Sequence, residues 1–386
     1  MDTPISENQE ISKKNEQNSS TDDVQIFKKR AEAVEESYDE KEINHVDLLN
    51  LSIQKGASDI HLAEGNPIYF RIGGRLQALE GIKQLSRKQA ENIIFNMLTP
   101  EQVDTLLKTK DFDCAYQHPS GETFRVNAFF KRKNLSMVTR MIPRNIKTME
   151  DLNLPPICMK FVKARQGLVL VTGPTGSGKS TSLAAMLEWM NVNLDHHIIT
   201  IEDPVEFIFD SKRSMFSQRE LKTDTMSMAN ALRSVLRQDP DVVVIGEMRD
   251  PETIGAALTI CETGHLVFGT LHTSGAPQTI SRLVGAFPPI QQDQVRVRVA
   301  ESLVGVVSQR LVPKIGGGRV AVFETFFNTP AFANMIRTGD SNQLNNAIQT
   351  GGKLGMISMQ KSAMSLIDRG VVAREDLDWL VEDDES

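Results

Sequence analysis

The segment Gly173–Ser180 has the sequence Gly-Pro-Thr-Gly-Ser-Gly-Lys-Ser and directly follows the apolar run Leu168–Thr172. The segment fits the pattern G-x-x-x-x-G-K-[ST] of the phosphate-binding loop, which joins a β-strand to an α-helix. β-branched and leucine residues predict the strand, and Leu183, Met186 and Leu187 recur at helical spacing after the loop. This one feature predicts an α/β sheet with a nucleotide site at the end of one of its strands.

Each residue type in the loop has a physical role. The glycines let the backbone curl so that successive N–H groups point at phosphate oxygens, and the helix N-terminus adds a partial positive charge. Lys179 is expected to place its ammonium on the β- and γ-phosphates, and the hydroxyl of Ser180 to ligate Mg²⁺. ATP and Mg²⁺ are therefore the expected cofactors. The predicted nucleotide-binding residues are Gly173, Pro174, Thr175, Gly176, Ser177, Gly178, Lys179, Ser180 and Thr181.

The composition is that of a soluble globular protein, with 40% hydrophobic and 24% charged residues in a chain of 386. No apolar run approaches the roughly 20 residues needed to span a bilayer, and the polar, acidic N-terminus is unlike a signal or transit peptide. The cysteines Cys114, Cys158 and Cys261 lie far apart without a C-x-x-C pair, which argues against a disulfide framework or a structural zinc. These features favour a reducing cytoplasm as the compartment.

The net charge of −7 is unevenly distributed along the chain. Residues 1–42 hold twelve acidic and six basic residues, and residues 375–386 hold seven acidic residues and no basic one. The intervening body therefore carries a net charge of +6. Such a body could meet an acidic partner or a membrane surface, although ordinary solvated charge explains most of it.

Composition and periodicity divide the chain into five parts. An N-terminal stretch without hydrophobic periodicity is predicted to be a disordered, acidic extension. A compact α+β region follows, then a linker marked by Pro155–Pro156, then an alternation of strands and helices typical of a parallel sheet. The predicted boundaries are 1–42 for the extension, 43–147 for the α+β domain, 148–166 for the linker, 167–372 for the α/β domain and 373–386 for an acidic C-terminal tail.

Helix caps and a meander of strands are the strongest local signals in the α+β region. Ser86 and Gln89 are expected to form a capping box, and Thr99–Pro100 to begin a second helix. Asp59 and His61 alternate with apolar residues, and we expect them on an exposed strand face rather than at a metal site. Strands are predicted at 60–62, 68–72, 75–79, 112–116, 123–130 and 135–142.

Acidic clusters follow two apolar strands of the predicted α/β domain. Glu202, Asp203 and Glu206 follow one strand, and Glu247 follows Val242–Ile245. In open α/β sheets, ligands bind beyond the carboxyl ends of the strands, where the phosphate-binding loop also lies. One cluster could steer Mg²⁺ while the other orients or deprotonates the attacking water, and the sequence leaves open which does which. The candidate Mg²⁺ ligands, direct or through water, are Ser180, Glu202, Asp203, Glu206 and Glu247, and the candidate catalytic acids are Glu206 and Glu247.

A third apolar strand, Leu266–Leu271, is bracketed by His265 and His272. Because both flank a strand that is predicted to end beside the phosphate-binding loop, both are candidate catalytic residues. They could sense the γ-phosphate or relay the nucleotide state to a neighbouring chain. A histidine with a purely structural hydrogen bond is the alternative at each position.

These clusters carry a resemblance to a known family, the hexameric ATPases of type II secretion and type IV pili. Leu236–Asp250 matches the family signature, Ile201–Phe207 resembles its Asp box, and Gly264–Thr273 resembles its His box. Within the family the chain is most similar to the pilus retraction ATPases. The segments that carry this closer similarity are Lys55–His61, Arg125–Phe129 and Ala347–Gly351.

The resemblance implies a PAS-like N-terminal domain and a RecA-like ATPase domain, assembled as a homo-hexamer. It implies a cytoplasmic motor, peripheral at the inner face of the cytoplasmic membrane, that hydrolyses ATP to drive pilus retraction in twitching motility. The implied partners are an inner-membrane pilus platform protein and a paralogous pilus ATPase. The resemblance also implies that Arg125 and Arg140, which match motif positions in the N-terminal domain, approach the nucleotide as catalytic arginines.

One departure concerns the retraction motif near the C-terminus. Ala331–Thr338 keeps the apolar spacing of that motif, but Ala333 and Thr338 stand in place of an arginine and a glutamate. An accessory retraction ATPase is therefore an alternative. Extension and type II secretion members usually have a larger N-terminal region and a C-x-x-C zinc loop, and this sequence has neither.

A nucleic-acid-dependent ATPase is the alternative from a different functional class. The sequence contains no zinc knuckle, no helix-turn-helix signature and no basic stretch interleaved with aromatics, and only 6% of residues are aromatic. No nucleic-acid partner is therefore expected. A subunit that only completes a ring without hydrolysing ATP is disfavoured by the intact Lys179, Ser180 and Glu247.

Overall fold

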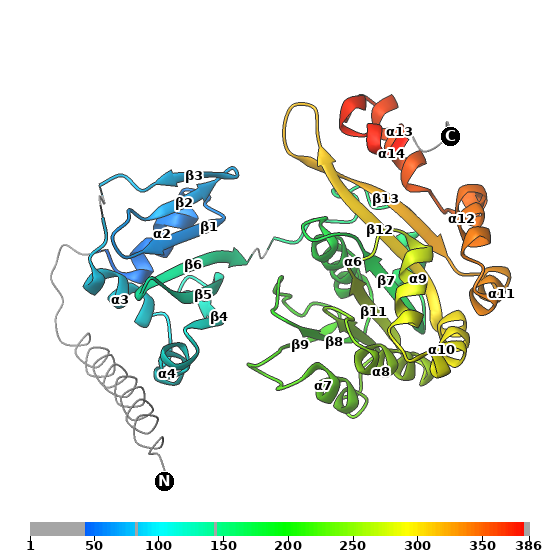
Figure 1. Ribbon diagram of the computed structural model, residues 1–386, viewed down its shortest axis with the longest axis horizontal. Helices are drawn as coiled ribbons and strands as arrows, with labels where there is room; N and C mark the ends of the chain where they lie inside the picture. The colour runs from blue at the N-terminus through cyan, green and yellow to red at the C-terminus, as the bar shows by residue number, and fades with distance from the viewer. Residues whose placement is uncertain (1–42, 82–83, 143–144, 382–386) are drawn as a thin grey trace, which may run out of the picture. The chain divides into compact units, whose positions relative to one another are not determined.

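The computed structural model describes residues 43–81, 84–142 and 145–381, which divide into two compact units (Figure 1). The N-terminal unit ends at residue 142, and the C-terminal unit begins at residue 145. The expectations for 1–42 and for the last acidic residues, 382–386, fall outside the described residues. Over the described ranges, no helix has the length and apolarity needed to cross a membrane.

The N-terminal unit is built on a six-stranded antiparallel sheet with the strand order β3-β2-β1-β6-β5-β4. Side chains alternate between its two faces, so that Phe124 and Val126 are fully buried while Arg125 between them is exposed. The strands are β1 (Asp59–Ala63), β2 (Tyr69–Ile72), β3 (Arg75–Ala78), β4 (Asp111–Gln117), β5 (Thr123–Lys131) and β6 (Asn134–Ile142), and the helices are α2 (His45–Gln54), α3 (Arg87–Phe95) and α4 (Pro100–Thr109).

Side-chain hydrogen bonds determine the residues at which α3 and α4 begin. The predicted capping box at α3 is confirmed: the Ser86 hydroxyl accepts from the Gln89 N–H, and the Gln89 side chain accepts from the Ser86 N–H. Thr99 and Gln102 form a second capping box in front of Pro100. All six predicted strands are present with ends within one residue of the expected ones.

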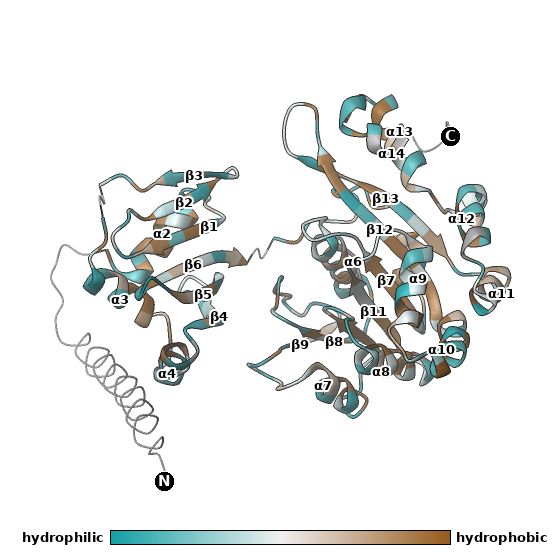
Figure 2. Cartoon of the chain, viewed as in Figure 1, coloured by the Kyte–Doolittle hydropathy of each residue, from teal (hydrophilic) through white to brown (hydrophobic). Residues whose placement is uncertain are grey.

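The C-terminal unit is built on a seven-stranded sheet with the strand order β13-β12-β7-β11-β10-β8-β9. All neighbouring strands are parallel except β12 and β13, which pair antiparallel. The central strands are buried along their whole length and largely hydrophobic (Figure 2), as expected for strands that are covered on both faces. The strands are β7 (Gly167–Thr172), β8 (His197–Glu202), β9 (Met215–Glu220), β10 (Val242–Ile245), β11 (Leu266–Leu271), β12 (Leu303–Pro313) and β13 (Arg319–Phe327).

Helices connect the strands of this sheet and continue beyond it to the C-terminus. The helix α6 follows the phosphate-binding loop, and α9 packs against β12 and β13. The α-helices are α5 (Cys158–Val162), α6 (Lys179–Asn193), α7 (Met228–Val235), α8 (Pro251–Glu262), α9 (Ala276–Gly285), α10 (Pro289–Ser302), α11 (Pro330–Thr338), α12 (Ser341–Thr350), α13 (Met359–Asp368) and α14 (Asp378–Val381).

The predicted linker 148–166 is wrong as a linker. Its apolar side chains are part of the core of the C-terminal unit, because α5 packs against α6 and β12. Phe161 is fully buried, and a Cβ atom added to Gly305 of β12 would lie 2.4 Å from its ring. The segment's buried core residues are Met149, Leu154, Ile157, Cys158, Phe161 and Val162.

The predicted C-terminal tail 373–386 also begins too early. Leu377 is fully buried in a small cluster with Val312 and Val372, so the chain stays folded through α14. The edge strand β13 makes further contacts with the C-terminal segment. The N–H of Thr325 donates to the carbonyl of Ile357 at 2.9 Å, and the N–H of Phe323 donates to the Ser362 hydroxyl at 3.0 Å.

The substitution Gly305→Ala tests whether the segment 148–162 is part of the core of the C-terminal unit. The new methyl group would overlap the Phe161 ring and the Phe326 carbonyl, so we expect a loss of about 1–3 kcal/mol in the free energy of unfolding. Urea unfolding followed by tryptophan fluorescence measures this, because both tryptophans, at 189 and 379, lie in this unit. The control Gly285→Ala adds a methyl group in open space, and an equal loss for both variants would contradict the close packing of α5 on β12.

Candidate nucleotide-binding site

The phosphate-binding loop connects β7 to α6, as its sequence predicts. Gly173, Gly176 and Gly178 have φ angles of +145°, +75° and +88°, values that favour glycine. At Gly173 a second constraint applies, because an added Cβ would lie 2.2 Å from the backbone oxygen of Gln309 on β12. Ser180 and Thr181 occupy the first turn of α6. The loop therefore presents the positive end of a helix, together with curled backbone, at the carboxyl edge of the sheet.

Lys179 is buried at the start of α6, with only 8% of its surface exposed. Its ammonium donates to the carbonyl oxygens of Gly173, at 2.8 Å, and Pro174, at 3.1 Å. Burial lowers the pKa of Lys179, and the carboxylates of Glu247 and Glu206 act in the opposite direction. The carbonyl oxygens of the loop thus accept hydrogen bonds from the lysine, and phosphate oxygens of a bound nucleotide would replace them.

Gln309 is a loop contact that the sequence analysis did not identify. Its side chain is 1% exposed, and its amide donates to the carbonyl of Ser177 at 2.7 Å. It lies on β12, more than a hundred residues from the loop, so no local motif connects the two. The only sequence signal is the polar stretch Ser308–Arg310 inside an otherwise largely apolar strand.

Glu247 follows β10 and is connected to the loop through contacts with His272. Arg249 donates from Nε and Nη2 to the two carboxylate oxygens of Glu247, both at 2.6 Å, and His272 Nε2 lies 3.3 Å from one of them. His272 Nδ1 in turn lies 3.5 Å from the hydroxyl of Thr175 in the loop. Burial raises the pKa of Glu247, but Arg249 and His272 outweigh burial and hold it below its usual value. The structure therefore brings Glu247, His272 and the loop together.

The second acidic cluster divides into one structural carboxylate and two exposed ones. Glu202 accepts hydrogen bonds from the Thr200 hydroxyl at 2.6 Å and, on its other oxygen, from the Glu206 N–H at 3.4 Å. Burial raises the pKa of Glu202. Asp203 and Glu206 are exposed, and Glu206 is close enough to act electrostatically on Lys179. Of this cluster, Glu206 is the better placed to meet a bound nucleotide.

The donors around the loop suit a magnesium ion that keeps most of its water. Within the residues that the structure describes, no three His, Cys, Asp or Glu side chains group closely enough to hold a metal alone. Magnesium in nucleotide sites is typically held by one or two protein oxygens together with phosphate oxygens and water. The Ser180 hydroxyl and the Glu247 carboxylate fit that requirement.

The prediction that both histidines lie beside the loop is wrong for His265. This residue precedes β11, whose first residue, Leu266, pairs with Gly167 at the start of β7. The loop follows the opposite end of β7, about 20 Å away for six residues of strand at about 3.3 Å each. The ring of His265 instead contacts the Thr263 hydroxyl at 3.0 Å. His265 therefore has a structural contact, and His272 alone reaches the loop of its own chain.

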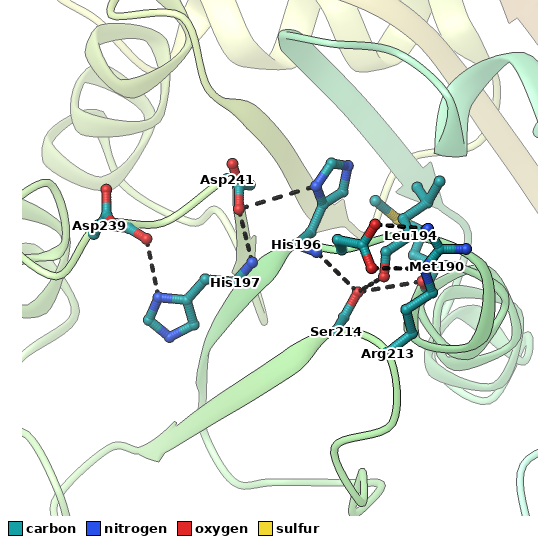
Figure 3. A network of polar contacts seen from close by, with 9 residues as sticks. Met190, Leu194, His196, His197, Arg213, Ser214, Asp239 and Asp241 are labelled. Atoms are coloured by element: carbon teal, nitrogen blue, oxygen red, sulfur yellow. Dashed lines mark hydrogen bonds and ion pairs between the residues drawn. The ribbon is translucent and has the colours of Figure 1, made fainter.

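Other polar side chains also gather at the amino edge of the sheet, and they bond to one another (Figure 3). His197 Nδ1 contacts the carbonyl of Asp239 at 3.0 Å, and the His197 N–H donates to the Asp241 carboxylate at 2.8 Å. The N–H of His196 donates to the Ser214 hydroxyl at 3.2 Å. These contacts fix the beginning of β8, and they support a structural role for His196 and His197.

The two candidate arginines belong to the N-terminal unit. Arg125 on β5 and Arg140 on β6 lie directly opposite each other in the ladder, and both are exposed. Arg140 Nε donates to Asp59 at 2.7 Å. Asp59 itself is only 4% exposed, so the expectation of an exposed position is wrong for it. Burial raises the pKa of Asp59, but hydrogen bonds from Ser58 and Arg140 hold it below the usual value.

The parallel sheet, the loop and the acidic and histidine side chains that meet it define a RecA-like P-loop protein with an N-terminal α+β domain. Residues 34–318 match the model of the family described as type II/IV secretion system protein. This match covers well over half of the chain, and the chain therefore belongs to that family. The match confirms the resemblance inferred from the signature segments of the sequence.

Two known relatives and one solved structure show where in the family the similarity lies. The chain is 45% identical over 329 residues to the type IV pilus retraction ATPase PilT of Pseudomonas aeruginosa, covering 85% of this chain and 95% of PilT. It is 37% identical over 330 residues to the type IV pilus ATPase PilU of the same organism, covering 85% and 86%. A crystal structure of the pilus retraction motor PilT with bound ADP has a TM-score of 0.84 and 38% identity, covering 89% of this chain and 98% of that one.

The two acids can be separated by their neutral isosteres. We expect Glu247→Gln to slow ATP turnover at least ~100-fold, because the charge that meets His272 is lost while the shape stays. Glu206→Gln should slow it less, since this exposed carboxylate has no such contact. Steady-state turnover measures both effects. The control variant is Glu252→Gln, which changes an exposed acid on α8. A larger loss for Glu206→Gln than for Glu247→Gln would mean that turnover depends mainly on Glu206.

Proposed function

We propose that this protein is the ATP-hydrolysing motor of type IV pilus retraction, which drives twitching motility. The observation that carries the proposal is the match to PilT over 95% of PilT's length, together with a loop, acid and histidine that meet in one place. The motor works in the cytoplasm at the inner face of the cytoplasmic membrane, against an inner-membrane platform protein of the pilus.

In the proposed reaction, backbone N–H groups of the loop and the Lys179 ammonium hold the β- and γ-phosphates of ATP. The Ser180 hydroxyl and Glu247 would hold Mg²⁺, which would neutralise charge on the phosphates and support the leaving group. Glu247 and Glu206 are the groups that orient or deprotonate the attacking water. His272 connects Glu247 to the loop, so it is placed to sense whether the γ-phosphate is present.

The proposed working form is a homo-hexamer in which each site is completed by its neighbour. Among the described residues of the C-terminal unit, Arg249 is the guanidinium that contacts a site acid, and it is paired with Glu247. An arginine supplied from another chain can raise the rate of phosphoryl transfer by ~10³–10⁵. Arg125 and Arg140, exposed and adjacent on one sheet face, are the proposed source.

An accessory, PilU-like role is the second candidate, and α11 is the observation that favours it. Ala333, in place of the arginine of the retraction motif, is 8% exposed and packs in the core. Thr338 bonds only to carbonyl oxygens of its own helix. This helix therefore lacks two charges that a fully competent retraction ATPase would present. The 37% identity to PilU leaves room for that role.

Mixed rings test the proposed arginine in trans. Neither Lys179→Ala nor Arg140→Ala chains should hydrolyse ATP at more than ~1% of the wild-type rate alone. Mixed rings should recover measurable turnover, because an intact loop then meets an intact arginine from its neighbour. The control mixture uses Arg75→Ala, an exposed arginine on β3, in place of Arg140→Ala. If mixed rings form and stay as inactive as their parents at every ratio, the arginine acts within its own chain or not at all.

A deletion strain separates the proposed function from its alternatives. Excess surface pili on cells that no longer twitch would support retraction, and cells without pili would show an extension motor instead. An accessory role would leave pili that still retract when only Lys179→Ala protein is supplied. The nucleic-acid alternative predicts an ATPase rate that rises severalfold with single-stranded DNA, whereas a pilus motor should not respond to it.

A further inference from the structure

We propose that Glu324 is a positioning residue that holds His272 in the nucleotide site, an inference that rests on the proposed ATP hydrolysis. Glu324 lies on β13, at the antiparallel edge of the sheet, and does not touch His272. It acts on the segment 272–276, which leaves the carboxyl end of β11 and leads into α9. This segment must be fixed if the His272 ring is to stay between Glu247 and Thr175.

The contact of Glu324 is with the first residue of α9. Its carboxylate accepts a hydrogen bond from the N–H of Ala276 at 2.8 Å. At the preceding residue, Gly275, φ is +97°, and an added Cβ would lie 3.2 Å from the same carboxylate oxygen. Burial raises the pKa of Glu324, and the Ala276 N–H opposes that shift. A carboxyl group is thus kept away from solvent, at a cost in free energy, where it caps the start of α9.

Two further contacts tie the same segment down. Arg310 of β12 donates to the Ser274 hydroxyl at 3.2 Å, and the hydroxyls of Thr273 and Thr279 are 2.7 Å apart. The segment is therefore held from the β12–β13 pair and from inside α9. By contrast, the His272 ring has longer contacts, at 3.3 Å and 3.5 Å.

Weak contacts at the ring make the position of His272 depend on how well its backbone is held. A misplacement of about 1 Å in a catalytic site can cost ~100-fold in rate. Ala276 is only four residues from His272, so loss of its anchor displaces or loosens the histidine. The expected result is slower turnover with little change in the binding of ATP, because the phosphate-binding loop keeps its own supports from Gln309.

A double-mutant cycle between Glu324 and His272 tests the proposal. We expect Glu324→Ala to lower kcat about tenfold, with KM for ATP changed by less than about twofold. Glu324→Gln retains an oxygen that accepts from Ala276, so its kcat should stay within about threefold of wild type. In a His272→Ala background, Glu324→Ala should cause less than about a twofold further loss, because the residue through which it acts is gone.

Glu301→Ala, at an exposed acid on α10, should leave kcat unchanged in both backgrounds. An unchanged kcat for Glu324→Ala, or an equal loss in both backgrounds, would overturn the proposal. If Glu324→Ala does not fold, Gly275→Ala replaces it in the same cycle, because its methyl group crowds the same carboxylate. A wild-type protein without ATPase activity would instead refute the proposed function.

Discussion

The nucleotide site depends on the close approach of two neighbouring parallel strands at one point. Gly173 at the end of β7 meets the backbone oxygen of Gln309 on β12 so closely that a Cβ could not be accommodated. The Gln309 side chain then supports the loop through Ser177. Because β7 lies between β12 and β11, the loop is held from one side by Gln309 and approached from the other by His272. The glycine is thus as much a packing requirement as a conformational one.

The charged groups of the site are satisfied by partners within the chain. Loop carbonyls accept from Lys179, and Arg249 donates to both oxygens of Glu247. Binding of a triphosphate would therefore exchange one set of partners for another instead of burying unpaired charges.

A sequence predicts structure most reliably where a pattern and its consequence lie close together in the chain. The loop, the capping box at Ser86 and the acid after β10 were all predicted and all lie where expected. His265 was misplaced because a motif that brackets a strand puts its two ends at opposite edges of the sheet. The supposed linker was misread because Phe161 finds its packing partners more than a hundred residues away, at Gly305 and Phe327. For the same reason, the roles of Gln309 and Glu324 had no local signal to reveal them.

The contacts between β13 and the C-terminal segment have a consequence for self-association. An edge strand normally exposes a row of unpaired N–H and C=O groups that can recruit a strand from another molecule. Here the outward N–H groups of Phe323 and Thr325 donate to Ser362 and Ile357. The chain's own C-terminal residues therefore block continuation of the sheet at β13. Copies of this protein that meet along this side must therefore contact each other through side chains, which disfavours the strand-to-strand aggregation to which open sheet edges are prone.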